Sequence, residues 1–310
     1  MQTGLTCAEV SGTTIEHVPV LTDSLAEQIN LPPDGVMVDA TIGQGGHSYL
    51  FGRFLGPDGV IIGLDVDKKA IQAARNRLRE LSRRRILVHA NFARIAQEVR
   101  KQGIEEVDLI FADLGISSAQ LADTQIGLSF QTDMPLDMRI DKRLKTTAAD
   151  IVNRVDEKSL AELIYRYGEE KTSRRIARCI VRQRQRERII TTTQLAKLIC
   201  KAAKRPGRGR KPRIHPATRT FQALRIAVNN ELENLKELLT TAPALLKKSG
   251  RIAVISYHSL EDRMVKANFK QNEKQNIYRI VSKKPIVPTK EEVTRNRRAR
   301  SAKLRIAERQ

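Results

Sequence analysis

The first third of the chain alternates short apolar segments that favour β-strands with segments that favour α-helices. Four of the apolar segments have the composition of buried strands, at residues 35–42, 59–67, 86–92 and 107–115. The intervening stretch at 68–81 places Ile71, Ala74 and Leu78 on one face of a helix. Strands that alternate with helices in this way form a parallel sheet with crossover helices. The pattern predicts an α/β fold with a doubly wound, mostly parallel, Rossmann-like sheet.

The alternation stops after the fourth predicted strand. Helical patterning and polar connections replace it, with helices expected over 159–168, 172–188 and 193–205. Asp156 and Thr192 are the expected N-caps of the first and last of these helices. The simplest explanation is an all-helical domain inserted at 118–214. The main domain is then discontinuous and consists of 1–117 and 215–310.

The rest of the chain completes the predicted sheet. A long helical stretch over 217–248, with a break near Pro243, leads into a fifth buried strand at 251–257. The segment 278–288 has the composition for one or two more strands, and 295–309 has the composition of a basic tail.

The charge of the chain limits its partners. Its 310 residues carry a formal charge of +21, and a compact protein repels itself at that charge unless a polyanion neutralises it. The N-terminus lacks a secretory pattern, and no run of eighteen uncharged apolar residues occurs. Cys7, Cys179 and Cys200 show neither disulfide nor zinc spacing. We expect a cytoplasmic protein that binds nucleic acid, with no metal and no membrane partner.

Most of the excess charge falls in the predicted insertion. Residues 171–213 contain 16 lysines or arginines and one acid, Glu187. Basic runs often form a solvated helix face, but here almost no acid is near to pair with them, so phosphate contact is favoured. The insertion is therefore the part of the chain predicted to bind nucleic acid.

A glycine loop follows the first predicted strand. Thr41, Ile42, Gly43 and Gln44 lead into Gly45, Gly46 and His47, immediately before a helix. Asp65 ends the next strand, 22 residues after Gly43, where a carboxylate can accept hydrogen bonds from ribose hydroxyls. The loop lacks the full dinucleotide pattern. Loop and carboxylate together indicate an adenosine-containing cofactor, either NAD or S-adenosylmethionine.

Three further residues follow later strands of the same sheet. Phe92 comes after the third strand, where its ring could pack against adenine or simply belong to the core. Asp113 ends the fourth strand, at the carboxyl edge where ligands bind in such sheets, and Gln120 lies within reach of it. A carboxylate between two apolar segments needs partners, which favours a site role for Asp113 over that of a helix cap.

Seven sequence blocks together resemble one known family, the ribosomal RNA small-subunit methyltransferases H. The blocks are HVPVL (17–21), DATIGQGGHS (39–48), GLDVD (63–67), DLIFADLGISSAQL (108–121), LSFQTDMPLDMR (128–139), RTFQALRIAVNNEL (219–232) and ISYHSLEDR (255–263). The resemblance implies S-adenosylmethionine as cofactor, 16S rRNA in the small ribosomal subunit as partner, and N4-methylation of a cytidine in the decoding region. It leaves the oligomeric state open, with a homodimer as one option. The residues it implies for cofactor binding are Gly45, Gly46, His47, Asp65, Phe92, Asp113 and Gln120.

The catalytic group and the base pocket are less defined by the sequence. Enzymes that methylate amino groups of DNA bases commonly have an Asp/Ser/Asn-Pro-Pro-aromatic motif after the fourth strand, whereas this chain has Asp113-Leu114-Gly115-Ile116. Asp113 is our candidate acceptor for the target amine. The polar residues after the fifth strand, Tyr257, His258, Ser259, Glu261 and Asp262, form either a wall of the base pocket or a capped turn. The competing functions are a nicotinamide-dependent oxidoreductase and a non-catalytic RNA-binding factor.

Overall fold

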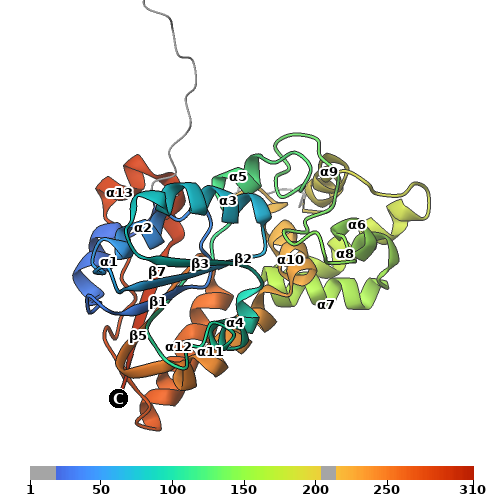
Figure 1. The fold of residues 1–310 in the computed structure, drawn as a ribbon. Helices are drawn as coiled ribbons and strands as arrows, with labels where there is room; N and C mark the ends of the chain where they lie inside the picture. Colours follow the sequence, from blue (N-terminus) through green and yellow to red (C-terminus); the bar gives the residue numbers. More distant parts are fainter. Residues whose placement is uncertain (1–18, 204–213) are drawn as a thin grey trace, which may run out of the picture.

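The computed structural model describes residues 19–203 and 214–310, and a seven-stranded sheet lies at its centre (Figure 1). In space the strands follow the order β3, β2, β1, β4, β5, β7, β6. Neighbouring strands are parallel from β3 to β5, and β7 runs antiparallel to β5 and β6. Their bounds are β1 Val36–Asp39, β2 Val60–Asp65, β3 Arg84–His89, β4 Val107–Asp113, β5 Leu246–Ser256, β6 Tyr278–Ile280 and β7 Lys303–Arg309. The predicted α/β class and the mostly parallel sheet are confirmed.

The strand order reverses at β1, which pairs with β2 on one side and with β4 on the other. At such a reversal the loops after the two neighbouring strands diverge and leave a crevice at the carboxyl edge of the sheet. Asp39, Asp65 and Asp113 are the last residues of β1, β2 and β4. The register therefore brings three carboxylates to the edge where a ligand would enter.

Helices cover both faces of the sheet, because successive side chains of a strand point to opposite faces. Met37 of β1 belongs to a hydrophobic cluster with α1, α2 and α3, whereas Val38 belongs to a second cluster with α4, α11 and α12. The bounds of these helices are α1 Thr22–Gln28, α2 Gly46–Gly52, α3 Lys68–Arg77, α4 Ile95–Arg100, α11 Glu231–Leu245 and α12 Ser259–Lys274. The shorter elements are η1 Leu78–Glu80, η2 Phe92–Arg94, α5 Ser118–Ala122, α13 Lys290–Arg295 and η3 Arg297–Ser301.

A third hydrophobic cluster lies outside the sheet, among five helices that form the right-hand part of Figure 1. These helices are α6 Ala148–Arg154, α7 Glu157–Gly168, α8 Ser173–Arg184, α9 Thr192–Ala203 and α10 Thr218–Asn229. α10 lies after the proposed insertion 118–214, yet Phe221 and Leu224 pack in this cluster. The proposed boundary at residue 214 therefore assigns α10 to the main domain, although this helix packs against the helices of the proposed insertion.

Two local expectations about helices are wrong. The predicted long helix breaks at Asn230, whose φ of 51° separates α10 from α11, whereas Pro243 lies in the last turn of α11. Thr192 is the first residue of α9 rather than its cap, because its Oγ1 donates to the carbonyl of Thr132 and accepts from the N–H of Met134. Thr191 caps the helix instead, accepting from the N–H of Gln194 at 3.3 Å. Asp156 caps α7 as expected.

The basic C-terminal segment is an ordered part of the sheet. β7 inserts between β5 and β6, and Leu304 and Ile306 pack in the first hydrophobic cluster. On the opposite face, Arg305 and Lys303 both pair with Asp262, at 2.6 and 3.3 Å. Two charges of the predicted basic tail are thus compensated by a carboxylate of α12.

Some expectations lie outside the described residues, namely those for Cys7, for the N-terminal pattern and for the basic loop 206–213. Cys179 and Cys200 are free thiols. Within 19–203 and 214–310, no helix combines the length and the apolar character that crossing a membrane requires.

Candidate active site

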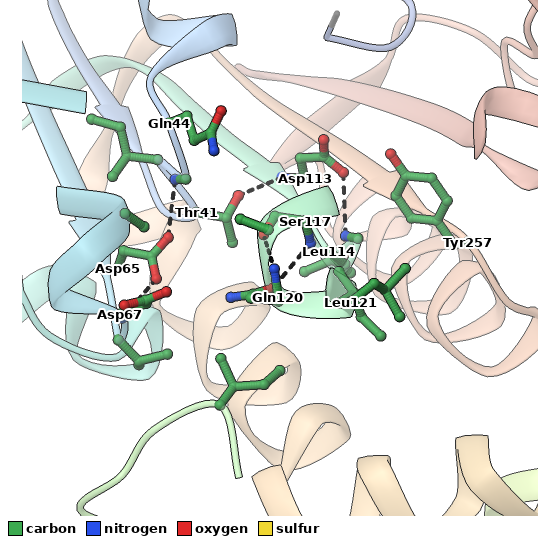
Figure 2. Close-up of a pocket in the computed structure, with 18 of the residues that line it drawn as sticks. Thr41, Gln44, Asp65, Asp67, Asp113, Leu114, Ser117, Gln120, Leu121 and Tyr257 are labelled. Carbon is green, nitrogen blue, oxygen red and sulfur yellow. Dashed lines mark hydrogen bonds between the residues drawn. The ribbon is translucent and has the colours of Figure 1, made fainter. Parts of the chain in front are cut away.

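A cavity of about 930 Å³ opens at the carboxyl edge of β1, β2 and β4. The loops that follow these strands form its walls, and Figure 2 shows Asp65, Asp113 and Gln120 arranged around it on three different segments. Six of the seven predicted cofactor-binding residues line it: Gly46, His47, Asp65, Phe92, Asp113 and Gln120. The tertiary structure thus brings together residues that are up to 74 positions apart in the sequence, from Gly46 to Gln120.

Gly45 is the one predicted residue that does not line the cavity. It has a φ of 79° and precedes α2, and a Cβ at this position would lie 3.2 Å from the Cα of Ala74. A larger residue would therefore strain the backbone and push the loop away from α3. Gly45 allows the loop to turn and to pack closely against α3, on the side away from the cavity. Its direct contact with a cofactor stays a prediction.

Asp39 holds the loop in place, which the sequence did not reveal. Its carboxylate accepts hydrogen bonds from the N–H of Thr41 at 3.1 Å and from the hydroxyl of Ser48 at 2.6 Å. The residue is 1% exposed, and burial raises the pKa of Asp39 to about 7. The hydrogen bonds from Ser48 and Thr41 lower it only in part.

The elevated pKa of Asp39 predicts a loss of stability as the pH rises. The folded protein binds the proton more tightly than the unfolded chain, whose Asp pKa is about 4, so the free energy of unfolding falls between pH 5 and pH 8. An Asp39→Asn protein should lose about 2 kcal/mol less than the wild type over this range. Denaturant titrations at both pH values measure the difference. Parallel pH profiles for the two proteins would contradict the prediction.

Asp65 connects the loop to the next strand. Its Oδ2 accepts from the N–H of Gly43 and its Oδ1 from the N–H of Asp67, both at 2.9 Å. Burial raises the pKa of Asp65 to about 6. Each carboxylate oxygen has a second lone pair beyond these bonds. The side chain can therefore accept from a pair of ligand hydroxyls while it keeps the loop fixed.

Asp113 is surrounded by polar groups from three segments. Its Oδ1 accepts from the N–H of Gly115 at 3.2 Å, and its Oδ2 lies 3.7 Å from Nδ1 of His47. The Tyr257 ring lies beside it, so close to Gly115 that a Cβ there would come 2.6 Å from the ring (Figure 2). Burial lowers the pKa of His47, and burial with the nearby Asp113 carboxylate raises that of Tyr257 far above its ordinary value. Near neutral pH, Asp113 therefore faces a neutral imidazole and a protonated phenol.

Phe92 and Gln120 form further parts of the wall. Phe92 begins η2, lines the cavity and packs partly against the second hydrophobic cluster. Gln120 is the third residue of α5, and its Oε1 accepts from the N–H of Ser117 at 2.9 Å in a capping box. Its Nε2 makes no hydrogen bond to any other part of the chain that the structure describes, so it can donate to a ligand.

The cavity extends to a second polar end that sequence reasoning missed. Arg225 of α10 pairs with both carboxylate oxygens of Glu231, each at 2.8 Å, and Asn229 and Asn234 line the same end. The left-handed turn at Asn230 brings these residues of α10 and α11 to one place. The spacing of Arg225 and Asn229, which places both on one helix face, was the available signal.

The polar residues after β5 form the capped turn, and two of them also line the cavity, so that their contact with a target base stays a prediction. Tyr257 and Glu261 line the cavity, and His258 with Glu261 forms the capping box of α12. Glu261 is 3% exposed and accepts from the N–H groups of Tyr257 and His258. Ser259 instead donates to Glu169.

One group of side chains near this end has the composition of a metal site. Ligand atoms of Glu231, His258 and Glu261 lie within 4.8 Å of one another. The bidentate contact with Arg225 already compensates the charge of Glu231, and Glu261 lies 3.1 Å from Nε2 of His258. The three side chains therefore already have partners within the protein, and the cluster belongs to the polar end of the cavity.

Sequence comparisons with known proteins agree on one family. A putative rRNA methylase from Clostridium thermocellum overlays 93% of this chain and 95% of its own, with 14% identity and a TM-score of 0.44. The ribosomal RNA small subunit methyltransferase H of Acidobacterium capsulatum is 46% identical over 298 residues, covering 94% of this chain and 98% of that protein. Its namesake from Cyanothece sp. is 47% identical over 293 residues, or 94% of each chain. The model of the MraW methylase family matches residues 14–310. The chain belongs to the MraW methylase family.

Proposed function

We propose that this protein transfers a methyl group from S-adenosylmethionine to N4 of a cytidine in the decoding region of 16S rRNA. The main support is that six residues predicted to bind the cofactor come from separate loops and line one cavity, in a chain that belongs to a methylase family. The name of its relatives, ribosomal RNA small subunit methyltransferase H, supports the choice of substrate.

The cavity fits this methyl donor. Its volume of about 930 Å³ lies within the range of small-molecule sites. Asp65 would accept from the two ribose hydroxyls through its remaining lone pairs, Phe92 would pack against the adenine ring, and Gln120 would donate to the edge of the adenine. The loop from Thr41 to His47 would hold the methionyl part. When bound, the donor supplies an electrophilic methyl group on a sulfonium.

The chain has to orient the target amine and accept its proton. The amine lone pair is delocalised into the cytosine ring, and an acceptor on the N–H localises it on nitrogen. Asp113 is that acceptor, since Gly115 fixes one of its oxygens at 3.2 Å while the other lies at the cavity wall. Tyr257 keeps its proton and stabilises the Asp113 carboxylate from the side. As the new N–C bond forms, the bond between the methyl carbon and sulfur would break, and its electron pair would stay on sulfur as a neutral thioether. The amine would lose one proton to Asp113, which would pass it to solvent.

The second polar end of the cavity takes the base. A base has to leave its stack before its amine can reach the donor. Asn234 offers its amide oxygen there, while the amide of Asn229 bonds the backbone of Met138 and Ile140. The bidentate contact with Arg225 fixes the position of the Glu231 carboxylate. These groups can bond the edge of a cytosine whose amine points toward Asp113.

Methyl transfer to small ribosomal subunits tests the proposal. The protein is incubated with labelled S-adenosylmethionine and with subunits from cells that lack it, and the modified nucleotide is mapped by mass spectrometry. We expect one N4-methylcytidine in the decoding region. A methyl group on a ring carbon, on a ribose or in another region would refute the assignment. Calorimetric titrations with NAD and with S-adenosylmethionine test the oxidoreductase alternative. Binding of NAD would support it, and binding of S-adenosylmethionine alone would exclude it.

The arginines of the helical part differ in their roles. Arg174, Arg175 and Arg182 project into solvent from α8, whereas Nη1 of Arg184 donates to the carbonyls of Val152 and Val155 at the end of α6. Arg184, which the sequence placed among the phosphate contacts, therefore has a structural role. The exposed three remain our proposed RNA contacts.

Neutralising these three arginines is expected to weaken RNA binding. An Arg174→Gln, Arg175→Gln, Arg182→Gln protein should bind small-subunit RNA with a slope of log affinity against log salt that is smaller by about 2, since each lost phosphate contact removes about 0.7 to 0.9. Its affinity for S-adenosylmethionine should stay unchanged. The matched control replaces Lys266, Lys270 and Lys274 by glutamine, which removes three exposed charges from α12, away from the cavity. Equal salt slopes for the two variants would argue against the α8 surface.

A further inference from the structure

A short turn rich in arginine lies at the mouth of the cavity. The η3 turn, residues 297–301, follows α13 and leads into β7. Arg297, Arg298 and Arg300 line the cavity, and all three side chains are exposed. They belong to the predicted basic tail 295–309, and none of the contacts proposed above for the methyl donor involves them.

The backbone of the turn is fixed by one buried residue and by hydrogen bonds. Ala299 is fully buried in the first hydrophobic cluster, so its neighbours on either side are directed outward. The side chain of Asn296 accepts from the N–H of Arg298 at 3.2 Å, and the N–H of Ala302 donates to the carbonyl of Ala299 at 2.8 Å. α13 is itself anchored, because Glu292 accepts from the N–H of Leu21 at 2.6 Å. The guanidinium groups therefore project from a fixed backbone.

Two charges of this turn have no acidic partner in the part of the chain that the structure describes. Arg297 and Arg300 form no ion pair within the described ranges 19–203 and 214–310. Three acids that line the cavity have other cations as partners, since Asp123 pairs with Lys69, Asp141 with Arg143 and Glu231 with Arg225. The guanidinium groups of Arg297 and Arg300, fixed three residues apart on the same turn, repel one another unless an anion joins them. The geometry points to an anionic ligand that covers the mouth of the cavity.

We propose that Arg297, Arg298 and Arg300 bind the phosphates that flank the target nucleotide and hold the RNA strand across the mouth of the cavity. This inference rests on the proposed function, because a base that enters the cavity leaves its own phosphates at the rim. Arginine suits the role, as its planar guanidinium binds phosphate through two parallel hydrogen bonds. The turn thereby positions the reacting nucleotide.

The placement of the turn explains why a second RNA contact is needed. In Figure 1, α13, which leads directly into the turn, lies at the opposite end of the molecule from α6–α9. The exposed arginines of α8 therefore cannot hold the strand at the mouth of the cavity. One surface binds a distant part of the folded RNA, and the η3 turn binds the strand that enters the site.

The alternative ligand is the carboxylate of the methyl donor, which is also an anion. Affinity for the donor measured without RNA separates the two. If the arginines bind RNA phosphates, their removal leaves donor affinity intact. If they bind the donor carboxylate, donor affinity falls with no RNA present.

The test replaces Arg297, Arg298 and Arg300 by glutamine in the full-length protein. Calorimetry with S-adenosylmethionine alone should give a dissociation constant within about twofold of the wild type. With small ribosomal subunits, KM for RNA should rise at least tenfold, and the slope of log affinity against log salt should shrink by about 2 for three lost contacts. The rate at saturating subunits should also fall, because the strand is no longer positioned. The α12 variant Lys266→Gln, Lys270→Gln, Lys274→Gln serves as the charge-matched control.

Each outcome decides the inference. A drop in donor affinity, or RNA kinetics equal to those of the α12 control, overturns it. A variant that loses its folding transition in thermal melts is replaced by Arg297→Gln, Arg300→Gln, which leaves Arg298 and the contacts of the buried Ala299 intact and should still raise KM severalfold. A wild-type protein that transfers no methyl group to small subunits refutes the proposed function itself, whatever the arginine variants do.

Discussion

Replacing Asp113 by asparagine is expected to slow methyl transfer by about 100- to 1000-fold at saturating donor and RNA. The N–H of Gly115 would keep the amide oxygen of the new side chain in the position of Oδ1, so the amide nitrogen would take the position of Oδ2. A hydrogen-bond donor would then face the N–H groups of the incoming amine, and no group would accept the proton. Single-turnover rates with labelled S-adenosylmethionine measure the effect.

Two further variants define the origin of this loss. Asp123 lines the same cavity but pairs with Lys69 at 3.1 Å, so Asp123→Asn should keep nearly normal turnover. Tyr257→Phe removes the hydroxyl beside Asp113 and leaves the carboxylate, so its rate should fall by only about tenfold. Near-normal turnover of the Asp113→Asn enzyme at saturating donor would exclude Asp113 as the acceptor.

Removing the Asp65 side chain is expected to weaken binding of S-adenosylmethionine by about 100-fold or more. Hydrogen bonds to a charged group contribute about 1.5–3 kcal/mol each, and Asp65→Ala removes those to the ribose together with the anchor of Gly43 at 2.9 Å. Turnover at saturating donor should change much less, because Asp65 does not touch the reacting amine. Calorimetry gives the affinity, and initial rates over a range of donor concentrations give the turnover.

The control for this experiment is the neighbouring aspartate. Asp67 accepts from the N–H of Lys69 at 2.8 Å and caps α3. Asp67→Ala should lower stability by about 1 kcal/mol through the lost cap while donor affinity changes little. If both alanine variants lose donor affinity equally, the effect arises from the loop as a whole and the ribose contact is not supported.

The sequence predicted the parallel sheet and the side of it that carries the site. Asp65 and Asp113 were predicted to lie at the carboxyl ends of their strands, because an aspartate that follows a run of buried residues marks the point where a strand leaves the core. The strand register confirms this placement. Their roles in binding and catalysis remain predictions, which the variants above test.

Features that depend on distant contacts were not visible in the sequence. The turn at Asn230, rather than Pro243, separates α10 from α11, because Pro243 is tolerated near the end of a helix while the left-handed Asn230 reverses the chain. The basic composition of 295–309 does not reveal whether the segment is ordered, and residues 303–309 form β7. This strand forms because Asp262, about 40 residues away, compensates Arg305 and Lys303.

The sequence by itself determined the α/β alternation, the glycine loop and the carboxylates that end the strands, since these depend on neighbouring residues and on the periodicity of side chains. Only the tertiary structure decided that Gly45 lies behind the cavity wall, that Arg225 and Glu231 form its far end and that the η3 arginines lie at its mouth. Local propensity acts over a few residues. A cavity is defined by side chains from segments that meet only when the sheet and the helices pack together.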